Sequence, residues 1–248
     1  MRPVLIFTHF DDRRIGLVGD GLELAGCPIV EANPVDGIPS WSIDEISAIV
    51  SFGGRLSARD ADGDPFLATE VELMRAALAR ETPVLGLCLG AQLLAVASGG
   101  EVFALGRMSV GWPRLSPLPA AREDPLFGAL NGGLAALEWH EDALTVGPGA
   151  VLLATTPGPG NALYRVGPSA WGSQAHIEVS EAMLLDGWLA DEAGIADVEA
   201  MGYEIDPFRT EARERLAAQI EAVRPVFKRF GELISARENL RGEAQPAY

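Results

Sequence analysis

Short apolar runs alternate with helix-like stretches along the N-terminal part of the chain. Runs of strand length occur at residues 4–7, 28–30, 48–52 and 84–87, and an amphipathic segment spans residues 66–79. Buried strands separated by helices indicate an α/β protein with a largely parallel sheet. We therefore predict a three-layer α/β fold, with a mostly parallel central sheet and helices on both of its faces.

The pattern becomes less regular after Glu101. A helix is predicted at residues 181–189 and a long amphipathic helix at residues 211–234. This change predicts an α/β domain over residues 1–190, followed by a helical extension over residues 191–248. We expect the extension to pack on or near the core as a lid, a packing arm or a homodimer contact. Shorter strands are predicted at residues 102–105, 136–139, 151–155, 162–166 and 170–174.

The charge balance excludes several classes of partner. The 248 residues carry 35 acidic and 19 basic side chains, for a formal net charge of −16. An acidic protein of this kind repels phosphate backbones and anionic membrane surfaces, so we expect no nucleic-acid or membrane partner. No apolar run approaches the roughly 20 residues that cross a bilayer, and no secretory leader is recognisable, so a cytoplasmic location is predicted.

The cysteines and histidines offer no metal site. Only two cysteines and three histidines are present, without CxxC or HExxH spacing. In a reducing compartment both cysteines remain free thiols. We expect neither a metal nor an organic cofactor.

The most informative segment is PVLGLCLGAQ at residues 83–92, where an apolar strand runs through a turn into a helix. Gly86 and Gly90 flank Cys88, and small residues at these positions allow the sharp strand-to-helix turn of a nucleophile elbow. The unpaired amides at a helix N-terminus favour a thiolate. The amide of Leu89 is also placed to donate to an oxyanion. Cys88 is therefore the candidate nucleophile.

A simpler interpretation is that a lone cysteine is a small buried apolar residue. We accept that interpretation for Cys27. For Cys88, the GxCxG arrangement at the end of a strand favours a nucleophile, provided that a general base lies nearby.

His176 and Glu178 are the candidate base and its orienting carboxylate. His176 follows a predicted strand, at the sheet edge where open α/β sheets bind ligands. Residues two apart on an extended segment share a face, so Glu178 can reach the His176 ring and fix its tautomer. Taken alone, a His-x-Glu sequence is usually an incidental surface pair; its position relative to Cys88 gives it weight.

Two motifs resemble those of the class I (triad) glutamine amidotransferases. GLCLGAQ at residues 86–92 is similar to the nucleophile signature of that family, and QAHIE at residues 174–178 is similar to its QFHPE motif. The resemblance is strongest to stand-alone members similar to the glutaminase domain of GMP synthase. It extends over about residues 4–189 and includes, in order, FGG at 52–54, GW at 111–112, WHED at 139–142 and YRVG at 164–167.

This resemblance implies a flavodoxin-like fold and a set of site residues. The implied triad is Cys88 as nucleophile, His176 as general acid and base, and Glu178 as the orienter of His176. The implied oxyanion donors are the amides of Gly54 and Leu89, and the implied substrate-binding residues are Gly53, Gln92, Trp139 and His140. An ordinary turn at Gly53 and Gly54 and a structural role for His140 are the alternatives.

The resemblance also implies an activity. The substrate would be glutamine or a related γ-glutamyl small molecule, and the ammonia would pass to a separate synthase subunit. Two alternatives stay open: hydrolysis of a γ-glutamyl amine or peptide, and a non-catalytic regulatory or binding subunit. Ala175 and Ile177 replace the aromatic residue and the proline of QFHPE, which leaves the approach of His176 less rigidly set.

Overall fold

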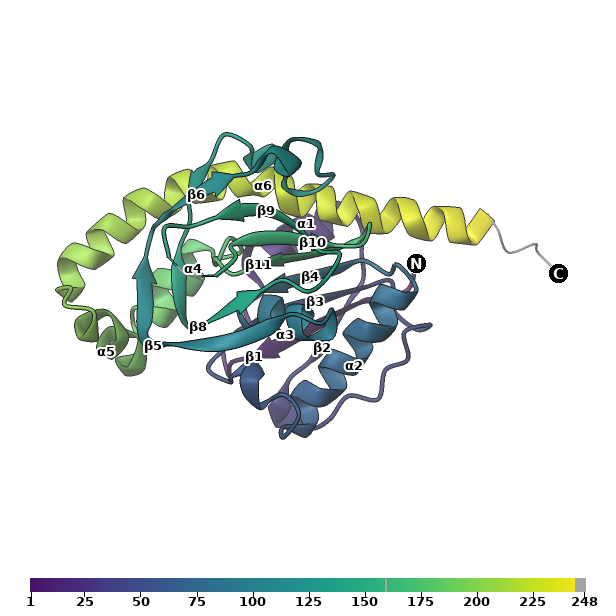
Figure 1. The fold of residues 1–248 in the computed structure, drawn as a ribbon, viewed down its shortest axis with the longest axis horizontal. Coiled ribbons are helices and arrows are strands. Elements are labelled where there is room, and N and C mark those ends of the chain that lie inside the picture. The colour runs from purple at the N-terminus through teal and green to yellow at the C-terminus, as the bar shows by residue number, and fades with distance from the viewer. Residues whose placement is uncertain (159, 244–248) are drawn as a thin grey trace.

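A nine-stranded sheet forms the centre of the computed structural model, which describes residues 1–158 and 160–243. The strand order is β2-β1-β3-β4-β11-β10-β9-β6-β7 (Figure 1). Strands β2, β1, β3, β4 and β11 run parallel, and the remaining neighbours pair antiparallel. The strands are β1 Val4–His9, β2 Ile29–Ala32, β3 Ala48–Gly54, β4 Val84–Leu87, β6 Arg114–Pro117, β7 Leu134–Ala135, β9 Val151–Thr155, β10 Leu163–Val166 and β11 Ala170–Ser173.

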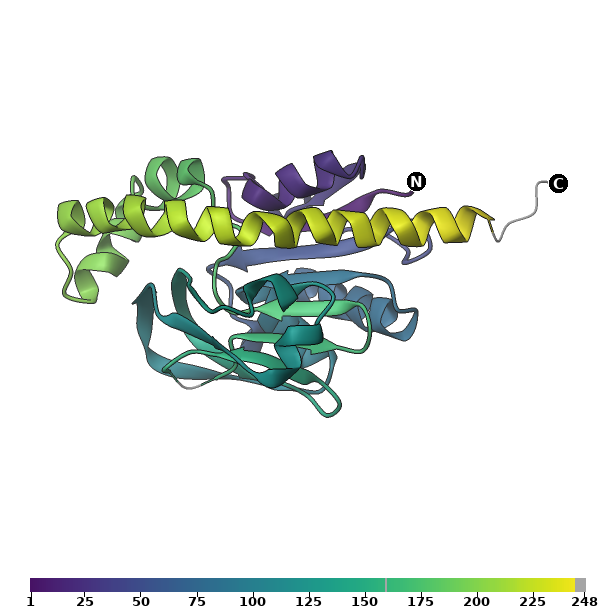
Figure 2. The same ribbon diagram turned by 90° about the horizontal axis from the view of Figure 1, so that it is seen from above.

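The alternation of side chains along β1 explains why helices cover both faces of the sheet. Val4 and Ile6 belong to one buried cluster, and Leu5 and Phe7 belong to another on the opposite face. The first cluster packs against α1 (Gly16–Leu24) and α6 (Ile205–Glu243), and the second packs against α2 (Pro65–Ala79) and α3 (Leu89–Ala97). Figure 2 shows α1 and α6 together on one side of the sheet. The predicted three-layer arrangement is confirmed.

An antiparallel pair, β5 (Glu101–Gly111) with β8 (Glu138–Thr145), forms a second, two-stranded sheet. It contacts α3, the helix that follows Cys88. The predicted strand at residues 102–105 is thus the start of a longer strand. The predicted strand at 136–139 is displaced towards the C-terminus, since Glu138 begins β8.

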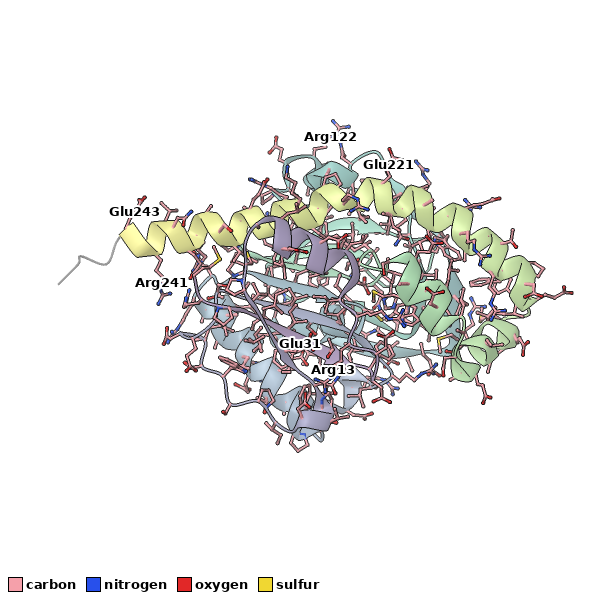
Figure 3. All side chains as sticks on the ribbon, turned by 180° about the vertical axis from the view of Figure 1, so that it is seen from behind. Arg13, Glu31, Arg122, Glu221, Arg241 and Glu243 are labelled. Carbon is pink, nitrogen blue, oxygen red and sulfur yellow. The ribbon has the colours of Figure 1, made fainter. Side chains whose placement is uncertain are left out.

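The C-terminal part is helical, as expected. The helix predicted at residues 181–189 is a short α-helix, α4 (Glu181–Met183), continued by a π-helical turn, Leu184–Trp188. Helix α5 (Glu192–Ala200) follows, and α6 extends beyond the predicted 211–234 at both ends. Figure 3 shows charged side chains along α6, among them Glu221 and Arg241, and the Arg241 guanidinium lies 3.9 Å from Asp44.

The extension shares its core with the sheet. Leu216, Val223 and Phe227 of α6 are buried in the same apolar cluster as Val4 and Val50 of the strands. A division at residue 190 therefore stays a prediction, and residues 244–248 of the extension lie outside the described part. Within the described residues, no helix is both long and apolar enough to span a bilayer.

Candidate active site

Cys88 occupies a strained turn between β4 and α3. Its φ of 52° and ψ of −105° lie in a region that non-glycine residues rarely adopt, at a cost of about 1–3 kcal/mol. The flanking glycines permit the turn: a Cβ at Gly86 would lie 2.4 Å from the Gly90 carbonyl oxygen, and one at Gly90 would lie 2.2 Å from the Ser51 carbonyl oxygen. The predicted strand-to-helix elbow is therefore present, with Cys88 at its apex.

The sheet register brings His176 to this turn. Strand β11 lies beside β4, with Ser173 opposite Leu87, and the Cys88 amide donates to the Ser173 carbonyl at 2.8 Å. His176 follows three residues after Ser173, at the same carboxyl edge of the sheet. Its Nδ1 donates to Glu178 Oε1 at 2.8 Å, and the side chains are only 4% and 1% exposed.

The sulfur and the imidazole converge on one backbone oxygen. Cys88 Sγ lies 3.8 Å from the Trp139 carbonyl oxygen, and His176 Nε2 lies 3.3 Å from the same atom. Burial alone would lower the pKa of His176, but the charges of Cys88 and Glu178, and hydrogen bonds to both, raise its pKa well above 6.5. The protonated ring is also the form that can donate from both nitrogens.

The glycine loop at the end of β3 packs against both partners. A Cβ at Gly53 would lie 2.8 Å from His176 Cε1 and 3.4 Å from Cys88 Cβ. A Cβ at Gly54 would lie 2.5 Å from His9 Cβ and 3.3 Å from Leu89 Cδ2. Gly54 and Leu89 are thus neighbours beside the elbow, and Leu89 is the first residue of α3, whose amide has no intrahelical acceptor.

Gln92 reaches the nucleophile through a second amide, that of Gln174. Gln92 Nε2 donates to the Asp142 carbonyl at 3.0 Å and to Gln174 Oε1 at 3.2 Å. Gln174 Nε2 in turn lies 3.7 Å from Cys88 Sγ, as a donor. Gln174 belongs to the QAHIE motif, but sequence reasoning assigned it no role; the structure places its amide at the sulfur.

The other two predicted substrate-binding residues lie on β8. Trp139 contributes its carbonyl to the site, and its indole Nε1 donates to Asp197 at 3.0 Å. His140 Nδ1 lies 2.9 Å from the Asp142 carbonyl, and its Nε2 is 3.6 Å from Glu138. Only Nδ1 of the His140 ring is hydrogen-bonded, within its own strand, whereas the buried Nε2 makes no hydrogen bond with the described residues.

Several site neighbours come from the C-terminal part, where sequence reasoning found none. The Trp188 ring packs edge-on against the His176 ring, with centroids 4.8 Å apart. Asp197 of α5 also bonds Arg55 at 3.3 Å, and Gln219 of α6 bonds the His176 carbonyl at 2.8 Å. Gln219 could have been singled out from the sequence, because it is a polar residue on the apolar stripe formed by Leu216 and Val223. Among the described residues, no group of three or more metal-ligating side chains gathers.

In this arrangement, a cysteine at a strand-to-helix turn and a histidine bonded to a carboxylate approach the same carbonyl oxygen. Comparison with known proteins gives the family. The sequence profile of the Peptidase C26 family matches residues 58–109. The glutamine amidotransferase-like protein YfeJ of Salmonella typhimurium is 28% identical over 176 residues, covering 65% of this chain and 74% of YfeJ.

Longer relatives and solved structures agree. A glutamine-hydrolysing GMP synthase of Aeropyrum pernix is 32% identical over 193 residues, covering 74% of this chain but only 34% of that enzyme. The crystal structure of a glutamine amidotransferase from Methylobacillus flagellatus superposes with a TM-score of 0.80, at 28% identity over 94% of this chain and 95% of that one. The chain is therefore a relative of the class I glutamine amidotransferases, with their fold, as its motifs predicted.

Proposed function

We propose that this protein hydrolyses the γ-amide of glutamine through Cys88, His176 and Glu178. The observation that carries the proposal is the convergence of the Cys88 sulfur and the His176 imidazole on the Trp139 carbonyl. On the other side of the ring, His176 Nδ1 lies 2.8 Å from Glu178 Oε1. Glutamine is supported as substrate by the names of the relatives, several of which are glutamine-hydrolysing GMP synthases.

The reaction proceeds in two halves. The Cys88 thiolate attacks the amide carbon, forming a C–S bond, and the amides of Gly54 and Leu89 donate to the oxyanion. Collapse breaks the C–N bond, and His176 passes its proton to the departing nitrogen to give ammonia. Water then attacks the γ-glutamyl thioester while His176 accepts its proton, and glutamate leaves with the Cys88 thiolate restored. Glu178 stabilises the imidazolium formed in each half.

The remaining predicted residues serve binding. Gly53 keeps space open beside His176, since any side chain there would meet the ring. Gln92 lines the glutamine pocket, and Trp139 and His140 contact the amino-acid end of the substrate, as the resemblance implies. The ammonia would pass to a separate synthase, as the resemblance implies; the matches cover 34% of the length of the GMP synthases.

Substitution of the nucleophile tests the proposal. Cys88→Ala should lower the rate of ammonia release from glutamine by about 10⁴-fold or more, because no other group can form the thioester. Cys27→Ser is the matched control: burial raises the pKa of Cys27, and its sulfur faces the Gly231 carbonyl at 3.8 Å, outside the site. Equal activity in Cys88→Ala and the parent protein would end the cysteine mechanism.

A second candidate, hydrolysis of γ-glutamyl amines or peptides, is favoured by the match to the Peptidase C26 family. Amine release from a γ-glutamyl anilide, compared with ammonia release from glutamine on the same preparation, separates the two substrates. Diazo-oxo-norleucine, an electrophilic glutamine analogue, adds a test of the binding site. Failure of this reagent to label Cys88, with neither substrate cleaved, would favour a non-catalytic subunit instead.

A further inference from the structure

Gln219 of α6 is a polar side chain in an apolar environment. It is fully buried, and it lies one helical turn from Leu216 and one from Val223, both buried on the same stripe. Burying a carboxamide is unfavourable unless its donor and acceptor are both satisfied. Its hydrogen bonds therefore explain why this position tolerates Gln.

Both ends of the Gln219 carboxamide bind backbone beside the triad. Its Nε2 donates to the His176 carbonyl at 2.8 Å, and its Oε1 accepts from the Leu137 amide at 2.8 Å. The His176 amide donates to the Leu137 carbonyl at 2.7 Å. These three bonds close a ring that joins the QAHIE segment to the start of β8.

The ring fixes two groups that meet the nucleophile. One is the His176 backbone, from which the imidazole reaches towards Cys88. The other is Leu137, which lies two residues before Trp139, the residue whose carbonyl oxygen lies 3.3 Å from His176 Nε2 and 3.8 Å from Cys88 Sγ. A shift of either segment would change the alignment of the sulfur and the imidazole.

We propose that Gln219 is a positioning residue, through which the long C-terminal helix holds His176 and Trp139 in register with Cys88. The need for such a tie follows from the sequence around His176, where Ile177 stands in place of the more rigid proline of the QFHPE pattern. Helix α6 runs across the same face as α1 (Figure 2) and is anchored by residues buried in the core, so it offers a firm support. The inference rests on the proposed function for its catalytic consequence.

Gln219→Met tests the inference, because it keeps the approximate shape and removes both hydrogen bonds. We expect kcat for glutamine hydrolysis to fall about 10- to 100-fold, as for a small misplacement of a catalytic group, with KM changed less than about threefold. Val223→Ala, one turn further along the same buried stripe, should lower Tm without lowering the kcat of the folded protein.

A second readout does not depend on glutamine. With only three histidines in the chain, the titration of His176 can be followed by NMR. Gln219→Met should lower the pKa of His176, because Cys88 and Glu178 raise it only while they face the ring, and it should slow the alkylation of Cys88 by iodoacetamide. Val223→Ala should leave both unchanged.

The outcomes separate the inference from the proposed function. A parent protein without activity on glutamine would refute the proposed function, while the NMR and alkylation measurements would still decide the role of Gln219. A kcat within twofold of the parent protein and an unchanged His176 titration in Gln219→Met would overturn the inference and leave Gln219 as a purely structural residue.

Discussion

Two buried histidine–glutamate pairs lie on either side of the Gly53–Gly54 loop. His176 donates through Nδ1 to Glu178 at 2.8 Å, whereas His9 at the end of β1 donates through Nε2 to Glu70 of α2 at 2.9 Å. Ideal Cβ atoms at Gly53 and Gly54 would meet His176 and His9 respectively. The two pairs therefore confine the same loop from opposite sides.

The pairs differ in what the second ring nitrogen faces. His176 Nε2 lies 3.3 Å from the Trp139 carbonyl oxygen, which the Cys88 sulfur also approaches, whereas His9 Nδ1 makes no hydrogen bond with the described residues. Both pKa values are raised although burial alone would lower them: Glu70 raises the pKa of His9, whereas Cys88 and then Glu178 raise the pKa of His176. A raised pKa and a carboxylate partner therefore do not by themselves mark a catalytic histidine; His176 differs from His9 in lying beside the proposed nucleophile.

The largest difference between the two pairs is expected when the imidazole ring of each histidine is removed in turn. His176→Asn should lower kcat/KM by about 10⁴-fold, because the thiol loses both its proton acceptor and the acid for the leaving group. His9→Asn should retain activity within about tenfold, because His9 acts only on the loop behind the site. Steady-state assays of both variants, at a temperature where circular dichroism shows each folded, measure the contrast. Equal losses of kcat/KM in the two variants would mean that the two pairs have the same role.

A smaller effect is expected from the loop between the pairs. In Gly54→Ala the new methyl would lie 2.5 Å from His9 Cβ, so the loop must move. Loss of one oxyanion donor typically costs about 10²–10³-fold in kcat, and we expect a loss of that order. Gly63→Ala is the matched control, since its nearest contact, the Asp60 carbonyl oxygen, lies at an ordinary 3.5 Å. Unchanged kcat in Gly54→Ala would remove the loop from the proposed mechanism.

The parallel half of the sheet and the elbow could be predicted because their signals are local. The strand at Val84–Leu87 is a continuous apolar run, and the glycines beside Cys88 are required by backbone contacts within one turn. His176 and Glu178 were predicted as a pair because they lie two residues apart and hydrogen-bond each other. Each of these inferences needed only neighbouring residues and the general behaviour of parallel sheets.

The missed features depend on contacts between distant segments. Strands β6 (Arg114–Pro117) and β7 (Leu134–Ala135) are too short to show a period; β6 pairs with the edge of β9, and β7 pairs in turn with β6. The π-helical turn at Leu184–Trp188 brings Trp188 over the His176 ring, which no local pattern indicates. Gln219 is 43 residues from His176, and only the packing of α6 shows what its amide binds.

The smallest catalytic effect, but a distinct effect on stability, is expected from His9→Gln. Gln can still donate a hydrogen bond to Glu70 but carries no charge. In the parent protein the folded-state pKa of His9 is raised above its unfolded value, near 6.5. The charged pair therefore stabilises the fold fully below about pH 6.5, and this contribution is lost as the pH rises through the folded-state pKa.

Urea unfolding of the parent protein and His9→Gln across pH 5.5 to 9 measures this contribution. We expect the variant to be less stable by about 1–3 kcal/mol at pH 5.5, with the difference shrinking towards pH 9. The raised pKa of His176 changes stability in the same direction in both proteins, so the difference between them isolates His9. A difference that stays constant over this range would show that the pKa of His9 is the same in the folded and unfolded states, so that the charge of His9 contributes nothing to stability.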